Sequence, residues 1–329
     1  MTDADRPSGV PAMAEPPLSR QAGAYPEWAP ATGRLPSRGG RRRAFSGAVV
    51  AAALIVVTVA AIAAAGPHRI AGHAVAAPGA DGTRQAADPG TSGQAAPRAV
   101  PRLADNALLA TGIALGPASC SLPELGRAPA QLEAFYRALL DCLEQSWRPA
   151  LDKAGEPMVA VALSLNLPTH SACGDAPSKN EAVAYYCGGD TTIYAPTEWM
   201  LADANLNRAR HIATIAHEYG HHVQRQSGIL AAAAARMSSP NQDTAADKEQ
   251  VRRIELQANC FGALFIAAAS GKGSITASLA NAGVADYGRA QDSDTHGTRK
   301  HQLVWAKAGF EGRTTAACNT WSAPVAEVG

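Results

Sequence analysis

The sequence predicts an α+β domain, rich in helices and with a small antiparallel sheet, preceded by disordered segments and a single transmembrane helix. Three observations support this prediction. Residues 1–102 are rich in Pro, Gly and Ala and contain one uncharged apolar run, whereas residues 103–329 show regular apolar periodicity. In this second part, two short strand-like stretches come before most of the stretches with a helical period. Few strands ahead of several helices are typical of the α+β class.

The N-terminal part divides into three segments of different composition. Residues 1–43 are rich in Pro, Gly, Ser and Arg, which is typical of a disordered cytoplasmic tail. Residues 44–66 carry no charge and are long enough to span a bilayer core. Residues 67–102 predict a flexible linker, because Ala, Pro and Gly dominate them. The folded domain is therefore expected over residues 103–329.

The apolar run predicts a retained signal anchor. Basic residues at Arg34, Arg38 and 41–43 precede it and become sparser after it, so the positive-inside rule places the N-terminus in the cytoplasm. The expected location is the cell membrane, with one pass and an extracytoplasmic C-terminal domain. A cleaved signal is the alternative, because residues 42–45 loosely match a twin-arginine signal and residues 63–65 offer a cleavage site. Both interpretations export the domain.

The six cysteines agree with export, because oxidising compartments favour disulfides over free thiols. Their spacing alone does not select one of the fifteen connectivities that six cysteines allow. Cys173 and Cys187 bracket a short segment with Gly and Pro, so a local bridge between them is the simplest pairing. No Cys-x-x-Cys pair is present, which argues against a cysteine zinc site. The cysteines are Cys120, Cys142, Cys173, Cys187, Cys260 and Cys318.

Apolar and β-branched patterns locate the elements of the exported domain. Residues 158–165 and 190–195 predict strands, and Pro196 ends the second. Gly228 is expected to cap the end of one helix, and Ser270-Gly271 ends another. Helices are expected over residues 129–151, 205–226, 232–237, 247–269 and 299–309.

One of these helices carries the pattern His217-Glu218-Tyr219-Gly220-His221. Two histidines four residues apart lie on one face of a helix, where both imidazoles can bind one metal ion. Glu218 then lies beside the water that completes the coordination of a catalytic zinc ion. An apolar stripe lies roughly opposite, so the helix is expected to separate the core from a cleft. This stripe is Ile212, Ile215, Tyr219 and Val223.

A catalytic zinc site needs a third protein ligand. Glu255 is the best candidate, because it lies inside an otherwise apolar helix. The alternative is a solvated helix residue, which is the usual environment of a glutamate.

Together these motifs resemble those of the neutral zinc metallopeptidase family, a group of membrane-anchored bacterial His-Glu-x-x-His peptidases. The resemblance covers roughly residues 104–322. It implies a zincin-like fold, Glu255 as third zinc ligand and a disulfide between Cys260 and Cys318. The matching segments are residues 173–174, 186–194, 217–224, 255–261, 296–298 and 318–320.

The chain departs from the family pattern at Asn259, where an aspartate is usual. Asn259 follows Glu255 by one helical turn and lies on the same face. In such sites the aspartate accepts the free N–H of a zinc histidine. The amide oxygen of an asparagine can accept the same bond but carries no charge. We therefore predict that Asn259 lowers the zinc affinity.

Three further histidines need an interpretation. His296 lies in a Gly-containing loop and could donate a hydrogen bond to the developing oxyanion. The alternative is a loop histidine that caps the following helix. His222 is expected to pack or to support a ligand, and His211 to lie on the helix surface.

The predicted function is a Zn²⁺-dependent, membrane-anchored endopeptidase that acts on peptides or proteins outside the cytoplasm. Zinc would activate the water, and Glu218 would act as general base. The strand at 192–194 is expected to align an extended substrate. The near-zero net charge does not indicate nucleic acid as a partner, and no pattern indicates an oligomeric state. Two alternatives remain: an inactive metal-stabilised binding or scaffold module, and a zinc hydrolase of a non-protein amide such as a cell-wall cross-link.

Overall fold

The computed structural model describes residues 102–179, 182–239 and 242–329. The predicted tail and transmembrane helix, and the predicted linker up to residue 101, lie outside these ranges. Within the described ranges, no helix combines the length and the apolar character that crossing a bilayer requires.

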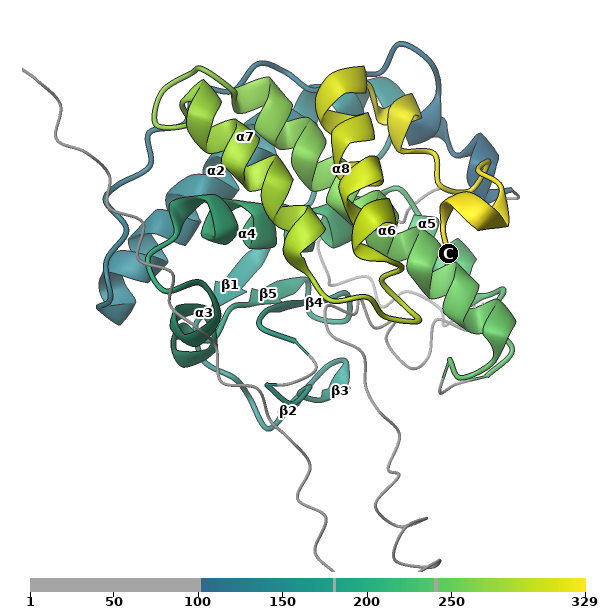
Figure 1. Cartoon of the computed structure of the whole chain (residues 1–329), viewed down its shortest axis with the longest axis horizontal. Coiled ribbons are helices and arrows are strands. Elements are labelled where there is room, and N and C mark those ends of the chain that lie inside the picture. Colours follow the sequence, from purple (N-terminus) through teal and green to yellow (C-terminus); the bar gives the residue numbers. More distant parts are fainter. Residues whose placement is uncertain (1–101, 180–181, 240–241) are drawn as a thin grey trace, which may run out of the picture. The chain divides into compact units, whose positions relative to one another are not determined.

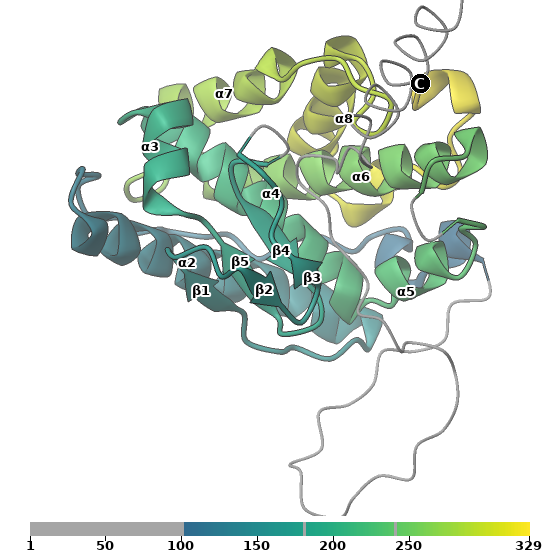
Figure 2. The same cartoon turned by 90° about the horizontal axis from the view of Figure 1, so that it is seen from below.

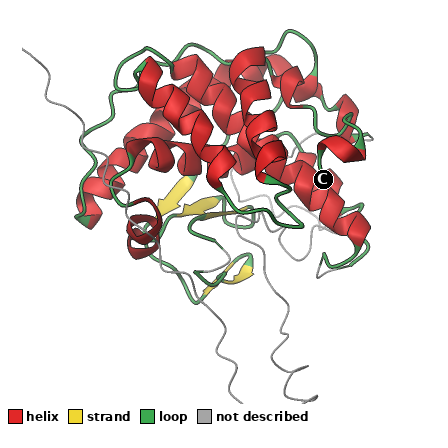
Figure 3. Ribbon diagram, in the orientation of Figure 1, coloured by secondary structure: helices red, strands yellow, loops and turns green. Residues whose placement is uncertain are grey.

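Helices dominate the described residues, and the strands are short, which confirms the α+β class (Figure 3). The strands are β1 (Ala162–Ser164), β2 (His170–Ser171), β3 (Gly174–Asp175), β4 (Tyr185–Cys187) and β5 (Thr192–Tyr194). The α-helices are α2 (Pro129–Ala154), α3 (Thr197–Ala204), α4 (Arg208–Gln226), α5 (Ile229–Ala234), α6 (Ala245–Ala269), α7 (Ala277–Asp286) and α8 (Arg299–Gly312).

The long helices agree with their apolar periodicity. The predictions for α2, α6 and α8 are confirmed to within three residues at either end. The helix predicted over residues 232–237 begins three residues earlier, as α5. Among the described residues, two α-helices were missed, α3 and α7, because each is short and its sequence carries no clear apolar stripe.

The three-stranded sheet is mixed, so the prediction of an antiparallel sheet was wrong. Its order is β1-β5-β4: β5 pairs in parallel with β1 and antiparallel with β4. The connection from β1 to β5 contains β2, β3 and β4, and a connection of that length allows the parallel pairing that a tight turn forbids. The separate β2–β3 pair is antiparallel.

Helix α4 lies between two layers of the fold. The sheet and α2 lie on one side of it, and α6, α7 and α8 lie on the other (Figures 1 and 2). The side chain of Asn207 caps the start of α4 by accepting the N–H groups of Ala209 and Arg210. The helix ends before Gly228, which has a φ of 74° and adopts the left-handed conformation expected of it.

Two glycines let α4 and α6 pack closely at the histidine motif. A methyl group on Gly220 would lie 3.0 Å from the carbonyl oxygen of Ala258. A methyl group on Gly262 would lie 3.1 Å from the backbone nitrogen of His217 and would overlap the hydroxyl of Tyr287. The absence of these side chains therefore brings the histidine face of α4 directly against α6.

All six cysteines are paired. The local bridge between Cys173 and Cys187 is confirmed, and so is the Cys260–Cys318 bridge that the family resemblance implied. The third bridge joins Cys120 to Cys142 on α2. The Cys260–Cys318 bridge fastens the segment after α8 to the helix that carries Glu255.

Candidate metal centre

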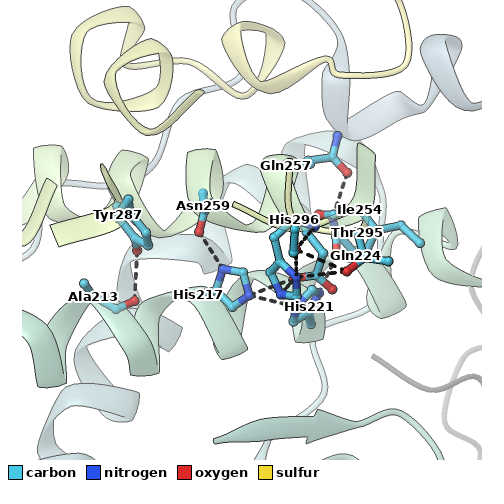
Figure 4. Close-up of polar contacts among 12 residues, drawn as sticks. Ala213, His217, His221, Gln224, Ile254, Gln257, Asn259, Tyr287, Thr295 and His296 are labelled. Atoms are coloured by element: carbon cyan, nitrogen blue, oxygen red, sulfur yellow. Dashed lines mark hydrogen bonds and ion pairs between the residues drawn. The ribbon is translucent and has the colours of Figure 1, made fainter. Parts of the chain in front are cut away.

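The structure brings His217, His221 and Glu255 together between α4 and α6. One ligand atom from each residue lies within 4.8 Å of the others. The two Nε2 atoms are 3.1 Å apart, and they lie 3.2 Å and 3.4 Å from Oε2 of Glu255. Figure 4 shows both imidazoles turned toward this point. One turn of α4 and one inward residue of α6 thus create a cluster of three donor atoms.

The cluster is more enclosed than the predicted cleft. The side chains of His221 and Glu255 are 0% exposed, and that of His217 is 11% exposed. Burial raises the pKa of Glu218. Burial acts in the same direction on Glu255, but His221 and His296 outweigh it and hold the pKa of this carboxyl well below its usual range. Burial would lower the pKa of His221, but Glu255 outweighs it and raises the pKa to about 9.

The outer nitrogen of each histidine in the cluster contacts a carboxamide oxygen. Nδ1 of His217 lies 2.8 Å from Oδ1 of Asn259, which is the contact that the sequence predicted for position 259. Nδ1 of His221 lies 2.9 Å from Oε1 of Gln224. Each imidazole therefore donates outward through Nδ1 and turns Nε2 to the centre.

Glu218 lies next to the cluster and is almost fully buried, with 2% of its surface exposed. A backbone hydrogen bond from Tyr186 on β4 reaches its carboxylate. Its Oε2 atom has no hydrogen-bond partner within the described part of the chain. A buried carboxylate oxygen without a partner is costly, so it indicates a group that receives a proton or a water in the working state.

His296 reaches the same centre from the loop before α8. Its Nε2 lies 3.3 Å from Oε2 of Glu255, and its side chain is 17% exposed. A narrow turn, in which Ser293 and Gly297 exchange backbone hydrogen bonds, holds the loop. Gly297 has a φ of 75°, a conformation that glycine adopts most readily. His296 thus faces the centre and does not cap α8, where the side chain of Thr298 takes that place.

Two other predictions for histidines have different outcomes. His222 packs in the core and hydrogen-bonds the hydroxyl of Tyr186 and the carbonyl of Val159. His211 is 0% exposed, so its prediction as a surface residue was wrong. It bonds the hydroxyl of Tyr136 on α2, a long-range partner that periodicity on α4 alone does not reveal.

The donor set fits a zinc ion. Two imidazole nitrogens and one carboxylate oxygen are the ligands of many catalytic zinc sites. The enclosed carboxylate of Glu255 faces three imidazoles, and a bound cation can take over the charge that protons would otherwise supply. The partnerless oxygen of Glu218 beside it fits a site that leaves one position for water.

Sequence reasoning missed Gln224, which contacts Nδ1 of His221, and Gln257, which contacts Gln224. Gln224 lies within the helix of the motif, one turn after His221, and this spacing could have identified it. Gln257 comes from α6 and contacts Gln224 at 3.0 Å. It has no local signal, because the contact exists only once the two helices pack.

Comparisons with known proteins agree with this geometry. Two curated relatives, both named "Uncharacterized protein YpfJ" and from two strains of Escherichia coli, are each 28% identical over 212 residues. Each alignment covers 57% of this chain and 70% of the relative. No solved structure matches the chain. Residues 121–321 match the family described as "putative neutral zinc metallopeptidase". This match includes both histidines, Glu218, Glu255 and the His296 loop, and the chain belongs to this family.

Proposed function

We propose that this protein is a zinc-dependent endopeptidase that hydrolyses peptide bonds outside the cytoplasm. One observation carries the proposal: a His/His/Glu cluster with all its ligand atoms within 4.8 Å adjoins a buried glutamate oxygen that has no partner. A zinc site that only stabilises a fold needs no general base. The partnerless oxygen of Glu218 therefore favours a catalytic site over an inactive scaffold module.

His217, His221 and Glu255 would hold the ion. When bound, zinc would lower the pKa of a coordinated water and polarise the substrate carbonyl. Glu218 would take a proton at Oε2 as the water attacks and would then deliver it to the departing amine. The backbone hydrogen bond from Tyr186 holds the carboxylate in place. Burial raises its pKa, which favours uptake of a proton by this carboxylate.

His296 would stabilise negative charge on the substrate carbonyl oxygen. Its Nε2 points to the centre and contacts Glu255 at 3.3 Å. Its partial exposure and that of His217 mark the side from which a substrate can approach. A hydrogen-bond donor fixed by a loop at this point needs no reorganisation as charge develops.

The edge of the sheet would align an extended peptide. The predicted strand, β5, is the central strand, and both its edges are taken by β1 and β4. That prediction is therefore wrong for β5. The strand β4 lies at the sheet edge, and its residue Tyr186 reaches Glu218, so its outer side is the better candidate.

Residues 44–66 would anchor the protein in the cell membrane, with the described domain outside the cytoplasm. The three disulfides support this location, since they persist in oxidising compartments. Labelling of intact cells with a membrane-impermeant reagent tests it. A domain that is labelled only after lysis would contradict the proposed orientation.

The variant Glu218→Gln tests the catalytic role. We expect it to bind zinc as the wild type does and to lose hydrolysis of an unspecific peptide pool. Metal analysis and the peptidase assay, each run with and without chelator, measure both properties. Retained hydrolysis would disprove the role of Glu218. Zinc binding by a wild type that cleaves cell-wall cross-links and no peptide would favour the amide-hydrolase alternative.

A further inference from the structure

A chain of buried amides leads from His221 away from the metal centre. Oε1 of Gln224 lies 2.9 Å from Nδ1 of His221. Nε2 of Gln224 donates to Oε1 of Gln257 at 3.0 Å and to the carbonyl of Ile254 at 2.8 Å. Gln257 in turn contacts the carbonyl of Cys318 and the indole of Trp321. We call Gln224, Gln257, Trp321 and the Cys318 carbonyl the amide relay.

The far end of the amide relay fixes the orientation of Gln257. The indole N–H of Trp321 can only donate, and it lies 3.3 Å from Oε1 of Gln257. The carbonyl of Cys318 can only accept, and it lies 2.9 Å from Nε2. A flipped Gln257 amide would place two donors together and two acceptors together. Only one orientation therefore satisfies both neighbours.

That orientation fixes Gln224 in the same way. Because Oε1 of Gln257 is an acceptor, the Gln224 atom facing it must be the N–H₂ group, whose second proton goes to Ile254. Oε1 of Gln224 then faces His221, so Nδ1 of His221 must carry a proton. Both glutamines are 0% exposed, so solvent is not available to replace a wrong partner.

The Cys260–Cys318 disulfide holds the two halves of the amide relay together. Cys260 lies on α6 one turn after Gln257, and Cys318 supplies the terminal carbonyl. Trp321 follows three residues later on the same segment. The bridge thus fixes the acceptor and the donor that orient Gln257.

We propose that the amide relay positions His221 for metal binding: Gln224 and Gln257 hold its Nδ1 as a donor, so that the Nε2 lone pair faces His217 and Glu255. The inference rests on the proposed zinc site and adds positioning residues to it. Without Gln257, the N–H₂ group of Gln224 keeps one of its two acceptors, the Ile254 carbonyl, and the amide is held less firmly. When the amide turns over, His221 meets an N–H donor where it needs an acceptor. Groups that hydrogen-bond the outer nitrogen of a metal-binding histidine in this way change metal affinity by about 10- to 100-fold.

The pair Gln257→Met and Gln257→Glu tests the relay, with zinc affinity measured by competition with a chelator. A methionine has a similar volume but offers Gln224 no acceptor, so we expect an affinity loss of about 10- to 100-fold. A glutamic acid keeps that acceptor and, when protonated, can donate to Cys318, so we expect near-wild-type affinity. The melting temperature of the metal-free protein should fall more for Gln257→Glu, because burying a carboxyl is costly. If the zinc affinities of the two variants fell in the same order as their melting temperatures, Gln257 would have a purely structural role and the proposal would be overturned.

A double-mutant cycle provides a second test. If Gln257 acts only through Gln224, the zinc affinity of Gln224→Met/Gln257→Met should equal that of Gln224→Met alone. The control cycle pairs Gln257→Met with Asn259→Ala, which acts on the other histidine, and its losses should add. Additive losses in the glutamine cycle would overturn the relay.

If Gln257→Met does not fold, the pair Gln224→Met and Gln224→Glu makes the same comparison at the residue that contacts His221.

Two outcomes separate the relay from the proposed function. A wild type that binds no zinc refutes the proposed function. If the wild type binds zinc and cleaves peptides, and Gln224→Met and Gln257→Met both bind zinc as tightly as the wild type, the relay alone is refuted.

Discussion

Nδ1 of His217 lies 2.8 Å from Oδ1 of Asn259, across the interface between α4 and α6. The imidazole donates and the amide oxygen accepts, so an uncharged group occupies the place where the family resemblance implies a carboxylate. Asn259 is only 4% exposed, so this hydrogen bond lies in a medium of low polarity. A charge at this position would act strongly on a bound cation.

We therefore predict that Asn259→Asp raises the zinc affinity by about tenfold, because a carboxylate makes the bound histidine a stronger ligand. Titration against a competing chelator measures the change. Asn281→Asp, at an exposed position of α7, controls for the added negative charge and should leave the affinity unchanged. Equal affinities of the wild type and Asn259→Asp would show that the uncharged partner does not weaken the site.

The structure brings the predicted residues His217, His221, Glu255 and Asn259 together, and there is a physical reason why the sequence indicated this grouping more closely than the sheet. The spacing of His217 and His221 is a local property of one helix, and Glu255 and Asn259 share one face of another. The relative position of the two residues in each pair can therefore be predicted from the sequence alone. The contacts between the pairs depend on close helix packing, which Gly220 makes possible.

What the sequence could not predict depends on contacts between distant segments. The sheet was predicted as antiparallel, but its two predicted strands, β1 and β5, pair in parallel because a long connection joins them. Apolar periodicity did not predict β4, because its three residues, Tyr-Tyr-Cys, carry no alternating pattern. His211 was placed on the surface because its partner Tyr136 lies 75 residues earlier in the chain. Gln257 was missed because its partners are Gln224 and Trp321, each on another element. In all three cases tertiary packing decided the environment and local pattern did not.

His296→Ala is expected to lower kcat by about 100-fold or more, because it removes a donor aimed at the developing oxyanion. Zinc affinity should change little, since His296 lies outside the group of three donors within 4.8 Å of one another. Steady-state kinetics and chelator competition measure the two effects. His301→Ala, which alters an exposed contact of α8, is the matched control. A loss of zinc affinity as large as the loss of kcat would instead make His296 a ligand.

Gly262→Ala is expected to destabilise the protein by about 1–3 kcal/mol. The added methyl group would overlap the Tyr287 hydroxyl and press on the backbone at His217, and these costs exceed the gain of at most ~1 kcal/mol in helix propensity. Urea unfolding measures the change. Gly283→Ala on α7 is the control: its methyl would meet the movable end of Ile266 at 3.3 Å and the carbonyl oxygen of Ala209 at 3.6 Å, an ordinary contact distance, so stability should stay near the wild-type value or rise. A stable Gly262→Ala would show that α4 and α6 can separate without cost.

Removing the Cys260–Cys318 bridge should cost about 4 kcal/mol of stability, and removing Cys173–Cys187 about 3 kcal/mol, because the first closes the longer loop. The two disulfide variants should differ more in their zinc affinity than in their stability. Only Cys260–Cys318 holds the carbonyl that orients Gln257. We expect the double Cys→Ala variant at 260 and 318 to bind zinc more weakly and the variant at 173 and 187 to bind it normally. Equal zinc affinities in two folded variants would disconnect the bridge from the metal centre.

His222 should make stability depend on pH. Its Nδ1 accepts from the Tyr186 hydroxyl at 3.0 Å, and its Nε2 donates to the Val159 carbonyl at 2.8 Å, so the ring is held neutral. Burial lowers its pKa to about 4. The value in the unfolded chain is ~6.5, so between these two values the unfolded state binds more protons. The free energy of unfolding should therefore fall as the pH drops from about 6.5 to about 4, by roughly 3 kcal/mol at most.

The variant His222→Gln isolates this contribution, because its side chain does not titrate. Urea unfolding between pH 7.5 and 4.5, with chelator present to remove the effect of metal, measures both proteins. The raised pKa of His221 acts at higher pH, since its contribution to stability is lost as the pH rises from about 6.5 to about 9. We expect the stability of the wild type to decrease with falling pH more steeply than that of His222→Gln. Parallel curves would mean that His222 becomes protonated in the folded protein without cost, and that its contacts to Tyr186 and Val159 do not hold it neutral.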